Sequence, residues 1–306
     1  MRANLASTWT TPCDKTVELF SRMALKVLRI LTGPLFEGAA MPTVVRTCII
    51  PTMSPHAKEP GFALAIETSG AVGSIALGRG ATVLGTQEFT RPRAHAVEFF
   101  PAIDSLCAAH GASPESIENI YVSAGPGSFT GLRIGITAAR TLATAVGARI
   151  VAVPTLEVIA QNALRCDPPP AQVAVILDAK RAHVYAATFA LTAGRSNDPR
   201  REPAYVPVCD PVEAEPAAYF ADLDRACALL GEGVLYHRAA AQASGLCILS
   251  EETYPPRAAT VYRLGGIKAA AGAFVDYRSL IPVYIRPPEA EEKWEQKPGS
   301  SGAAKP

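Results

Sequence analysis

A glycine-rich segment at residues 124–136, AGPGSFTGLRIGI, carries the residue types best suited to holding an anion. It lies between an apolar run and a helical pattern, so the sequence predicts a strand, a tight turn and a helix start. Gly125 and Gly127 permit positive φ and the close approach of a ligand or another backbone. Ser128 or Thr130 can cap the free amides of the helix. Such a turn suits an anion, because the amides and the positive end of the helix dipole act together.

The spacing of these glycines excludes the two best-known phosphate loops. No Lys-Ser or Lys-Thr pair follows the last glycine, so the segment is not a Walker A loop. Thr130 stands where the dinucleotide fingerprint has its third glycine. A turn that only links a strand to a helix fits the local pattern equally well. The segment alone leaves anion binding and a structural role open.

Two acidic residues end apolar strands that begin two similar stretches of the chain. Glu67 ends the predicted strand 62–67, Asp178 ends the predicted strand 172–178, and a second strand follows each after a turn. Facing each other across a cleft, the two carboxylates would suit a nucleotide-associated cation. A carboxylate at a strand end is also a common turn former. The repetition itself predicts a duplicated α/β domain.

Composition limits the chemistry available elsewhere. The formal net charge of +1 gives no global attraction to nucleic acid, and no run of Lys and Arg interleaved with aromatic residues suggests an RNA groove. The five histidines form neither H-x-x-x-H nor H-E-x-x-H, so we expect no helix-borne metal site. The seven cysteines include no C-x-x-C pair, which indicates free thiols in a reducing compartment.

Two predicted helices frame the glycine turn. In the helix after the turn, small residues recur at every fourth position: Gly131, Gly135, Ala139 and Ala143. This stripe lets a neighbour pack unusually close, and a tight contact is needed to offset glycines that each cost about 1 kcal/mol relative to alanine. The stripe does not say whether that neighbour is the same chain or another. The earlier helix, 95–110, contains Pro101, which predicts a late start or a kink.

The length of 306 residues suits two domains. Residues 1–60 differ from the rest: they contain a basic amphipathic stretch that is too short and too charged to span a bilayer, and we expect them to be poorly ordered. An upstream start codon, a transit peptide and a membrane-surface segment all fit this extension. We expect a first half at 61–167 with strands at 62–67, 72–77 and 82–90, a second half at 171–287, and a tail at 288–306.

Four segments taken together resemble the TsaB family, the dimerisation subunit of the bacterial system that makes threonylcarbamoyladenosine at position 37 of tRNA. They are IETS at 66–69, GPGSFTGLRIG at 125–135, DAKR at 178–181 with the following Val184-Tyr185, and PVYIR at 282–286. The resemblance covers about residues 61–294. It implies an α/β class protein with a duplicated actin- and Hsp70-like ATPase (ASKHA) fold, in which two related halves carry mixed β-sheets flanked by helices.

The resemblance also implies a function. The chain would be a non-catalytic scaffold or activating subunit for threonylcarbamoylation of N6 of adenosine 37 in ANN-decoding tRNAs, acting by heterodimerising with the catalytic subunit TsaD. A TsaE-type ATPase would join the complex, and tRNA would be reached only through the complex. Separately from the resemblance, the small-residue stripe is compatible with self-packing into a homodimer when the partner is missing. A cytoplasmic protein without a membrane contact is expected. The family pairs through the first two helices of the first half, which maps the partner interface onto His95, Phe99, Ile103, Gly131, Gly135, Ala139 and Ala143.

The resemblance names no catalytic or metal-ligating residue in this chain, and no cofactor is certain. At most it implies ATP or ADP with Mg²⁺ at the complex interface, and the candidate cofactor-binding residues are Glu67, Thr68, Gly127, Ser128 and Asp178. Two departures matter: Glu67 replaces the usual Asp, and His183 stands where the family more often has Glu. The alternative function is an autonomous ASKHA-type phosphotransferase or a metallopeptidase-like enzyme, with Asp178 as its plausible base.

Overall fold

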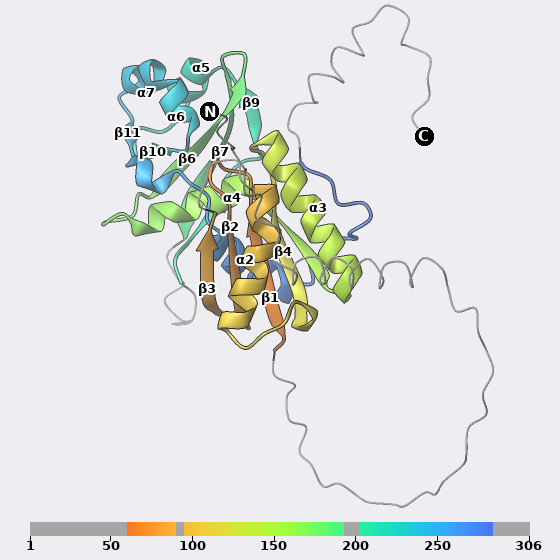
Figure 1. Ribbon diagram of the computed structural model, residues 1–306. Coiled ribbons are helices and arrows are strands. Elements are labelled where there is room, and N and C mark those ends of the chain that lie inside the picture. Colours follow the sequence, from red (N-terminus) through yellow and green to blue (C-terminus); the bar gives the residue numbers. More distant parts are fainter. Residues whose placement is uncertain (1–59, 90–94, 193–201, 284–306) are drawn as a thin grey trace, which may run out of the picture. The chain divides into compact units, whose positions relative to one another are not determined.

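Two mixed β-sheets with the same strand order form the frame of the computed structural model (Figure 1). The structure describes residues 60–89, 95–192 and 202–283, although the side chains of 95–97 are not among those described. From Gly61 onward the chain forms one compact unit. The expected N-terminal extension and the C-terminal tail fall outside the described residues, apart from Pro60.

The first sheet has the order β3-β2-β1-β4-β5. Its antiparallel part is β1 (Phe62–Glu67), β2 (Ser74–Arg79) and β3 (Thr82–Glu88), and β4 (Ile117–Gly125) and β5 (Arg149–Pro154) run parallel to β1. The predicted strand 62–67 is confirmed, whereas the second strand begins at Ser74 rather than at residue 72.

The second sheet repeats this topology in the order β11-β10-β6-β7-β8. β6 (Gln172–Lys180), β7 (His183–Thr192) and β8 (Ala204–Pro207) are antiparallel, and β10 (Cys227–Leu230) and β11 (Cys247–Ile248) are parallel to β6. A further strand, β9 (Val212–Ala214), pairs with β7. The repeated strand order confirms the duplicated α/β architecture expected from the sequence.

Seven α-helices of the described residues surround these sheets. They are α2 (His95–Ala109), α3 (Phe129–Val146), α4 (Thr155–Ala160), α5 (Pro216–Ala221), α6 (Gly233–Tyr236), α7 (Arg238–Ser244) and α8 (Ala258–Ala270). Short 3₁₀ turns lie at Pro114–Ser116, Gln161–Arg165 and Glu251–Thr253. Pro101 lies within α2, so the helix does not start late. None of the described helices combines the length and the apolar character needed to cross a membrane.

Both faces of the first sheet are covered, which explains why all six residues of β1 are buried. On one face, α3 packs near Ile66, with α2 beside it. On the other face α8 packs across β1, β2, β4 and β5, although it lies at the end of the chain. There the ring of Tyr262 meets that of Tyr121 edge to face at 5.6 Å.

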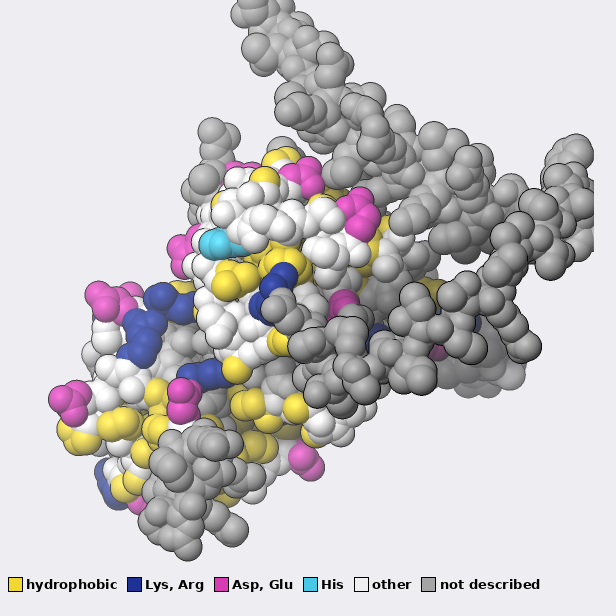
Figure 2. Space-filling model, turned by 90° about the horizontal axis from the view of Figure 1, so that it is seen from below, with side chains coloured by type: hydrophobic (Ala, Val, Ile, Leu, Met, Phe, Trp, Pro, Cys, Tyr) yellow, Lys and Arg dark blue, Asp and Glu magenta, His cyan; other side chains and the backbone are white. Residues whose placement is uncertain are grey.

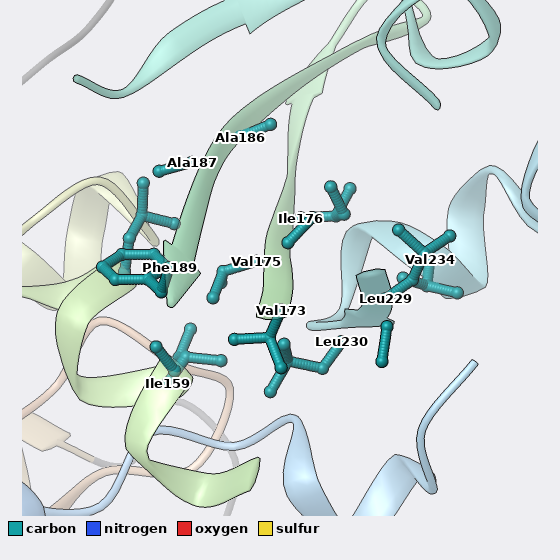
Figure 3. Packing of buried hydrophobic residues seen from close by; sticks show 14 of the residues in the cluster. Ile159, Val173, Val175, Ile176, Ala186, Ala187, Phe189, Leu229, Leu230 and Val234 are labelled. Atoms are coloured by element: carbon teal, nitrogen blue, oxygen red, sulfur yellow. The ribbon is translucent and has the colours of Figure 1, made fainter. Parts of the chain in front are cut away.

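The core of the second sheet forms around β6 (Figure 3). Val173 and Val175 lie with Phe189 of β7 and Ile159 of α4, and Ile176 lies with Val234 of α6. α4 contacts strands of both sheets, so it links the two halves of the unit.

Candidate functional site

The glycine turn joins β4 to α3, as the sequence predicted. Gly125 has a φ of +112°, which only glycine adopts easily. Ser128 is the N-cap of α3, because its Oγ accepts from the backbone amide of Gly131 at 3.3 Å. Its own amide donates to the carbonyl oxygen of Ser69 at 2.8 Å. The turn is therefore held against the β1–β2 connection.

The close approaches that these glycines permit are made by the chain itself. A Cβ on Gly127 would lie 2.8 Å from Cβ of Ser69, and one on Gly131 would overlap the carbonyl oxygen of Thr68. On its other side the turn meets the C-terminal segment, since a Cβ on Gly125 would lie 2.6 Å from the carbonyl oxygen of Val283. The Cα sides of these glycines are therefore packed against backbone of the same chain, and the Ser128 amide is already bonded to Ser69, although the Ser128 residue itself is exposed. The turn thus offers a nucleotide phosphate no free amide at Ser128.

Glu67 lies in the same region, at the end of β1, and is fully buried. Its Oε1 accepts from both the amide and the hydroxyl of Ser69 at 2.6 Å, and its Oε2 has no hydrogen-bond partner within the described structure. Burial raises the pKa of the Glu67 carboxyl, while contacts with Ser69 and Ser123 oppose the rise. Thr68 is also fully buried, and its hydroxyl has no described partner. Neither side chain is accessible to a nucleotide or its cation in this structure.

Asp178, the fifth candidate, lies at the corresponding end of β6 in the second sheet. Its Oδ1 accepts from the amide of Lys180 at 3.1 Å, and its Oδ2 pairs with Nζ of the same lysine. Nε2 of His237 lies 3.8 Å from Oδ1. Burial, followed by the charge of Asp178, raises the pKa of Glu232 next to this group. His183 turns its ring to the Arg181 carbonyl oxygen, with Nδ1 at 3.0 Å, and no chemistry is assigned to it.

The residues expected to form the partner interface are buried within the chain. Gly131, Gly135, Ala139 and Ala143 of α3 face the sheet, and so do Phe99 and Ile103 of α2. The side chain of His95 is not among those described. The small residues of α3 thus serve close packing against Thr68 and Ile66 of the same chain. This corrects the interpretation of the stripe as a docking surface, because side chains sealed in one subunit cannot contact another.

The surface that α2 and α3 do present is made of other residues. On α2 the exposed positions include Pro101, Ser105 and Ala108, and on α3 they include Thr130, Thr137 and Thr141. Sequence reasoning missed these residues because small polar and apolar side chains on a helix surface carry no signal of their own. The helical periodicity could have found them, since they fall opposite the buried positions.

A second feature missed from the sequence is the route of the C-terminal segment. The amide of Val275 donates to Ile150 of β5, and the amide of Val283 donates to the Ala124 carbonyl oxygen at 2.7 Å. Residues 275–283 therefore run along α3 to the glycine turn (Figure 1). The motif PVYIR at 282–286 begins where this segment reaches the turn.

The duplicated sheet topology and the acid at the end of each first strand define the class of the protein as an actin- and Hsp70-like (ASKHA) α/β fold. Two solved structures agree with this class. A Pseudomonas aeruginosa protein described as similar to peptidase YeaZ, and YeaZ from the same species, both match at a TM-score of 0.61 and 25% identity. They cover 74% and 73% of this chain and 100% and 99% of their own.

Sequence comparison narrows the class to a family. The family model described as TsaD, tRNA N6-adenosine threonylcarbamoyltransferase, matches residues 89–294. The tRNA threonylcarbamoyladenosine biosynthesis protein TsaB of Bacillus subtilis (strain 168) is 32% identical over 235 residues, which span 76% of this chain and 96% of that protein. TsaB of Escherichia coli (strain K12) is 35% identical over 126 residues, or 41% and 54% of the two chains. The chain belongs to the broader family that the model describes and, within it, to the TsaB family.

Proposed function

We propose that this chain is a non-catalytic subunit in the synthesis of threonylcarbamoyladenosine in tRNA, and that it acts by pairing with a TsaD-type transferase. The modified position would be N6 of adenosine 37 in ANN-decoding tRNAs. The names of the Bacillus and Escherichia relatives support the pathway. The match to the TsaD family model supports a partner of related fold, because related chains pack through related surfaces.

The observation that supports the non-catalytic role is that the chain itself uses the Ser128 amide of the glycine turn and buries the carboxylate of Glu67. A phosphate-handling enzyme of this fold class needs open amides and an accessible carboxylate at the ends of its first strands. Here the Ser128 amide donates to Ser69 of the same chain, and Glu67 has no exposed surface. Among the described residues there is also no group of three or more His, Cys, Asp or Glu side chains that could hold a metal ion.

The proposed pairing face is the outer surface of α2 and α3, which lie side by side on the first sheet. Its exposed residues are mostly small and uncharged, so another pair of helices can approach closely. Docking there would favour the competent conformation of the partner by binding that conformation more tightly. We place TsaE-type ATPase binding, an ATP or ADP with Mg²⁺ shared with the partner, homodimerisation of the isolated chain and a cytoplasmic location in the same proposal. The bounds of the two halves, 61–167 and 171–287, stay part of the proposal.

The test is a reconstitution in which each component is omitted in turn. Modified adenosine in an ANN-decoding tRNA transcript is measured with this chain, a TsaD-type subunit, a TsaE-type ATPase, ATP and the threonylcarbamoyl donor system. Modification is expected only when this chain and the transferase are both present. The alternative, an autonomous phosphotransferase or metallopeptidase-like enzyme, predicts ATP turnover or peptide cleavage by this chain alone. Such turnover, or full modification without this chain, would overturn the proposal.

A further inference from the structure

The outer side of α3 and residues 276–283 form a single surface. Nη2 of Arg140 donates to the carbonyl oxygen of Arg278 at 3.3 Å, and Val283 is anchored at the start of the helix through Ala124. Figure 1 shows α3 with α2 on one side and this segment on the other. The segment therefore extends the surface of α3 away from the proposed pairing face.

This surface is basic. α3 contains no Asp or Glu, and its two arginines, Arg133 and Arg140, are seven residues apart, which is about two helical turns and places them on the same side. Arg278 adds a third guanidinium. None of the three forms an ion pair with an acidic side chain of the described residues. The one acid in the segment is Asp276, whose Oδ1 accepts from the amide of Arg278 at 2.9 Å.

Two of the guanidinium groups lie on aromatic rings. Cζ of Arg133 is 3.9 Å from the ring centroid of Phe129, and Cζ of Arg278 is 5.5 Å from that of Tyr277. Phe129 is 42% exposed, which is unusual for a phenylalanine at a helix start. Stacking holds the planar guanidinium in place with N–H donors at its edge, an arrangement that suits phosphate oxygens and unstacked bases. Arg278 also uses one hydrogen bond on the side chain of Tyr277.

We propose that this basic face, defined by Arg133, Arg140 and Arg278, contacts the phosphate backbone of the tRNA substrate. The inference rests on the proposed function, because that function supplies the polyanion. The three guanidinium groups lie together along the outer side of α3, and none of them forms an ion pair with a described acid, although the charge of Asp276 acts on Arg278. On the side drawn in Figure 2, described lysines and arginines lie in small groups beside acidic, apolar and other side chains. The face was invisible in the sequence because the fold brings its arginines together from α3 and from the end of the chain.

The pairing face and the basic face can be used together. Thr130, Thr137 and Thr141 are turned about a fifth of a turn from Arg133 and Arg140, away from the C-terminal segment. A partner docked over α2 and the threonines of α3 would leave the arginines at the edge of the contact. A tRNA held by the partner could then lie against them.

The test uses the full chain with its TsaD-type partner and a fluorescent, unmodified ANN-decoding tRNA transcript. Binding is measured over a series of salt concentrations for the wild type and for the triple variant Arg133→Gln, Arg140→Gln, Arg278→Gln. Three lost phosphate contacts should weaken binding at least about tenfold at 0.1 M salt and reduce the slope of log affinity against log salt by about 2 to 3. The same three positions changed to lysine should keep most of the slope, because the charge remains.

A matched control removes three exposed arginines elsewhere: Arg225→Gln, Arg238→Gln, Arg263→Gln. It makes the same change in net charge and should leave affinity and slope close to wild type. Equal behaviour of the two triple variants would overturn the inference. A second result would also overturn the inference: the test variant pairs poorly with the partner, but the complex that does form binds tRNA normally. Ile281 and Val283 are exposed next to the arginines, so this result would identify the face as a protein contact. If the wild-type chain fails to pair with any TsaD-type subunit, the proposed function is wrong instead. The basic face is then tested by comparing tRNA binding of the wild-type chain and of the triple variant, each without a partner.

Discussion

At the scale of single residues, the two strand-end acids do the same local work in different surroundings. The Glu67 carboxylate accepts a hydrogen bond from the amide of Ser69, and the Asp178 carboxylate accepts one from the amide of Lys180. In each case the donor lies two residues further along the chain. Both are turn-forming carboxylates. Glu67 is sealed, whereas Asp178 keeps a partly exposed side chain beside a lysine and a histidine. The sequence predicted both acids and their turns, but exposure depends on what packs over each turn, which no local pattern contains.

Burial of Glu67 predicts a pH dependence of stability. Because burial raises the pKa of this carboxyl in the folded state above its ordinary value of 4.5, the folded chain binds more protons than the unfolded chain between the two pKa values. Glu67 therefore makes the free energy of unfolding fall as pH rises through that window. We expect Glu67→Gln to remove this contribution, so that the variant is more stable than the wild type at pH 8 and loses its advantage toward pH 4.5. Urea unfolding at several pH values measures the difference; parallel pH profiles for the two proteins would contradict the burial argument.

Two helical glycines offer a matched test of close packing. A Cβ on Gly131 would overlap the Thr68 carbonyl oxygen, whereas a Cβ on Gly266, in α8, meets nothing within 4 Å. Gly131→Ala should cost about 1 to 3 kcal/mol of unfolding free energy, because the neighbour is backbone and cannot move aside. Gly266→Ala should gain about 0.5 to 1 kcal/mol, because alanine loses less entropy in a helix. Chemical denaturation measures the unfolding free energy of each variant. Equal effects of the two substitutions would show that the close contact with Thr68 is not the reason for glycine at position 131.

At the scale of helices and strands, position was more predictable than orientation. The sequence placed these helices at about 95–110 and 131–147, within two residues of the bounds of α2 and α3, because the period of their apolar residues is clear. It also showed that the glycines of α3 needed a close neighbour. It did not identify that neighbour as the end of β1, since spacing is the same for a contact within a chain and one between chains. A leucine at Gly135 would enter Thr68 and Ile66, so it would report on folding and not on pairing.

Exposed positions give the better test of the pairing face. We expect the double variant Ser105→Arg, Thr137→Arg to weaken binding to a TsaD-type subunit at least tenfold, about 1.4 kcal/mol or more, because bulky charges would prevent close helix contact. Both side chains are exposed, so the melting temperature of the isolated chain should stay within a few degrees of wild type. Titration calorimetry with the purified partner measures the affinity.

The control for this variant is Ile267→Arg, which places the same side chain at an exposed position on the opposite side of the first sheet. It should pair with wild-type affinity. If the double variant also pairs normally, the partner docks elsewhere and the outer surface of α2 and α3 has another use.

At the scale of the whole molecule, the two halves are not separate, because α8 follows the strands of the second sheet in the chain but packs on the first sheet. The repeat of a strand, an acid and a hairpin was readable from the sequence, and the fold class followed from it. The position of α8 was not readable, because its small and apolar residues would suit either sheet. α8 covers one face of the first sheet, and there the hydroxyl of Tyr262 donates to the Gly80 carbonyl oxygen at 3.0 Å. α4 contacts both sheets as well.

This packing of α8 predicts that the first half cannot fold alone. A fragment of residues 61–170 would expose the face of its sheet that α8 covers, including the buried side chains of Ala65, Tyr121 and Val153. The fragment would also lack Val261 and Tyr262, whose burial contributes on the order of 1.5 to 3 kcal/mol each. Those losses approach the whole stability of a typical domain. We expect no cooperative urea transition for the fragment alone, and recovery of one when residues 171–283 are added as a separate chain.

The same second chain carrying Tyr262→Ala should restore the transition poorly, whereas one carrying the surface change Arg238→Gln should restore it fully. A cooperative transition of 61–170 alone, unchanged by the second chain, would show that the two halves are independent domains and that α8 only decorates the first.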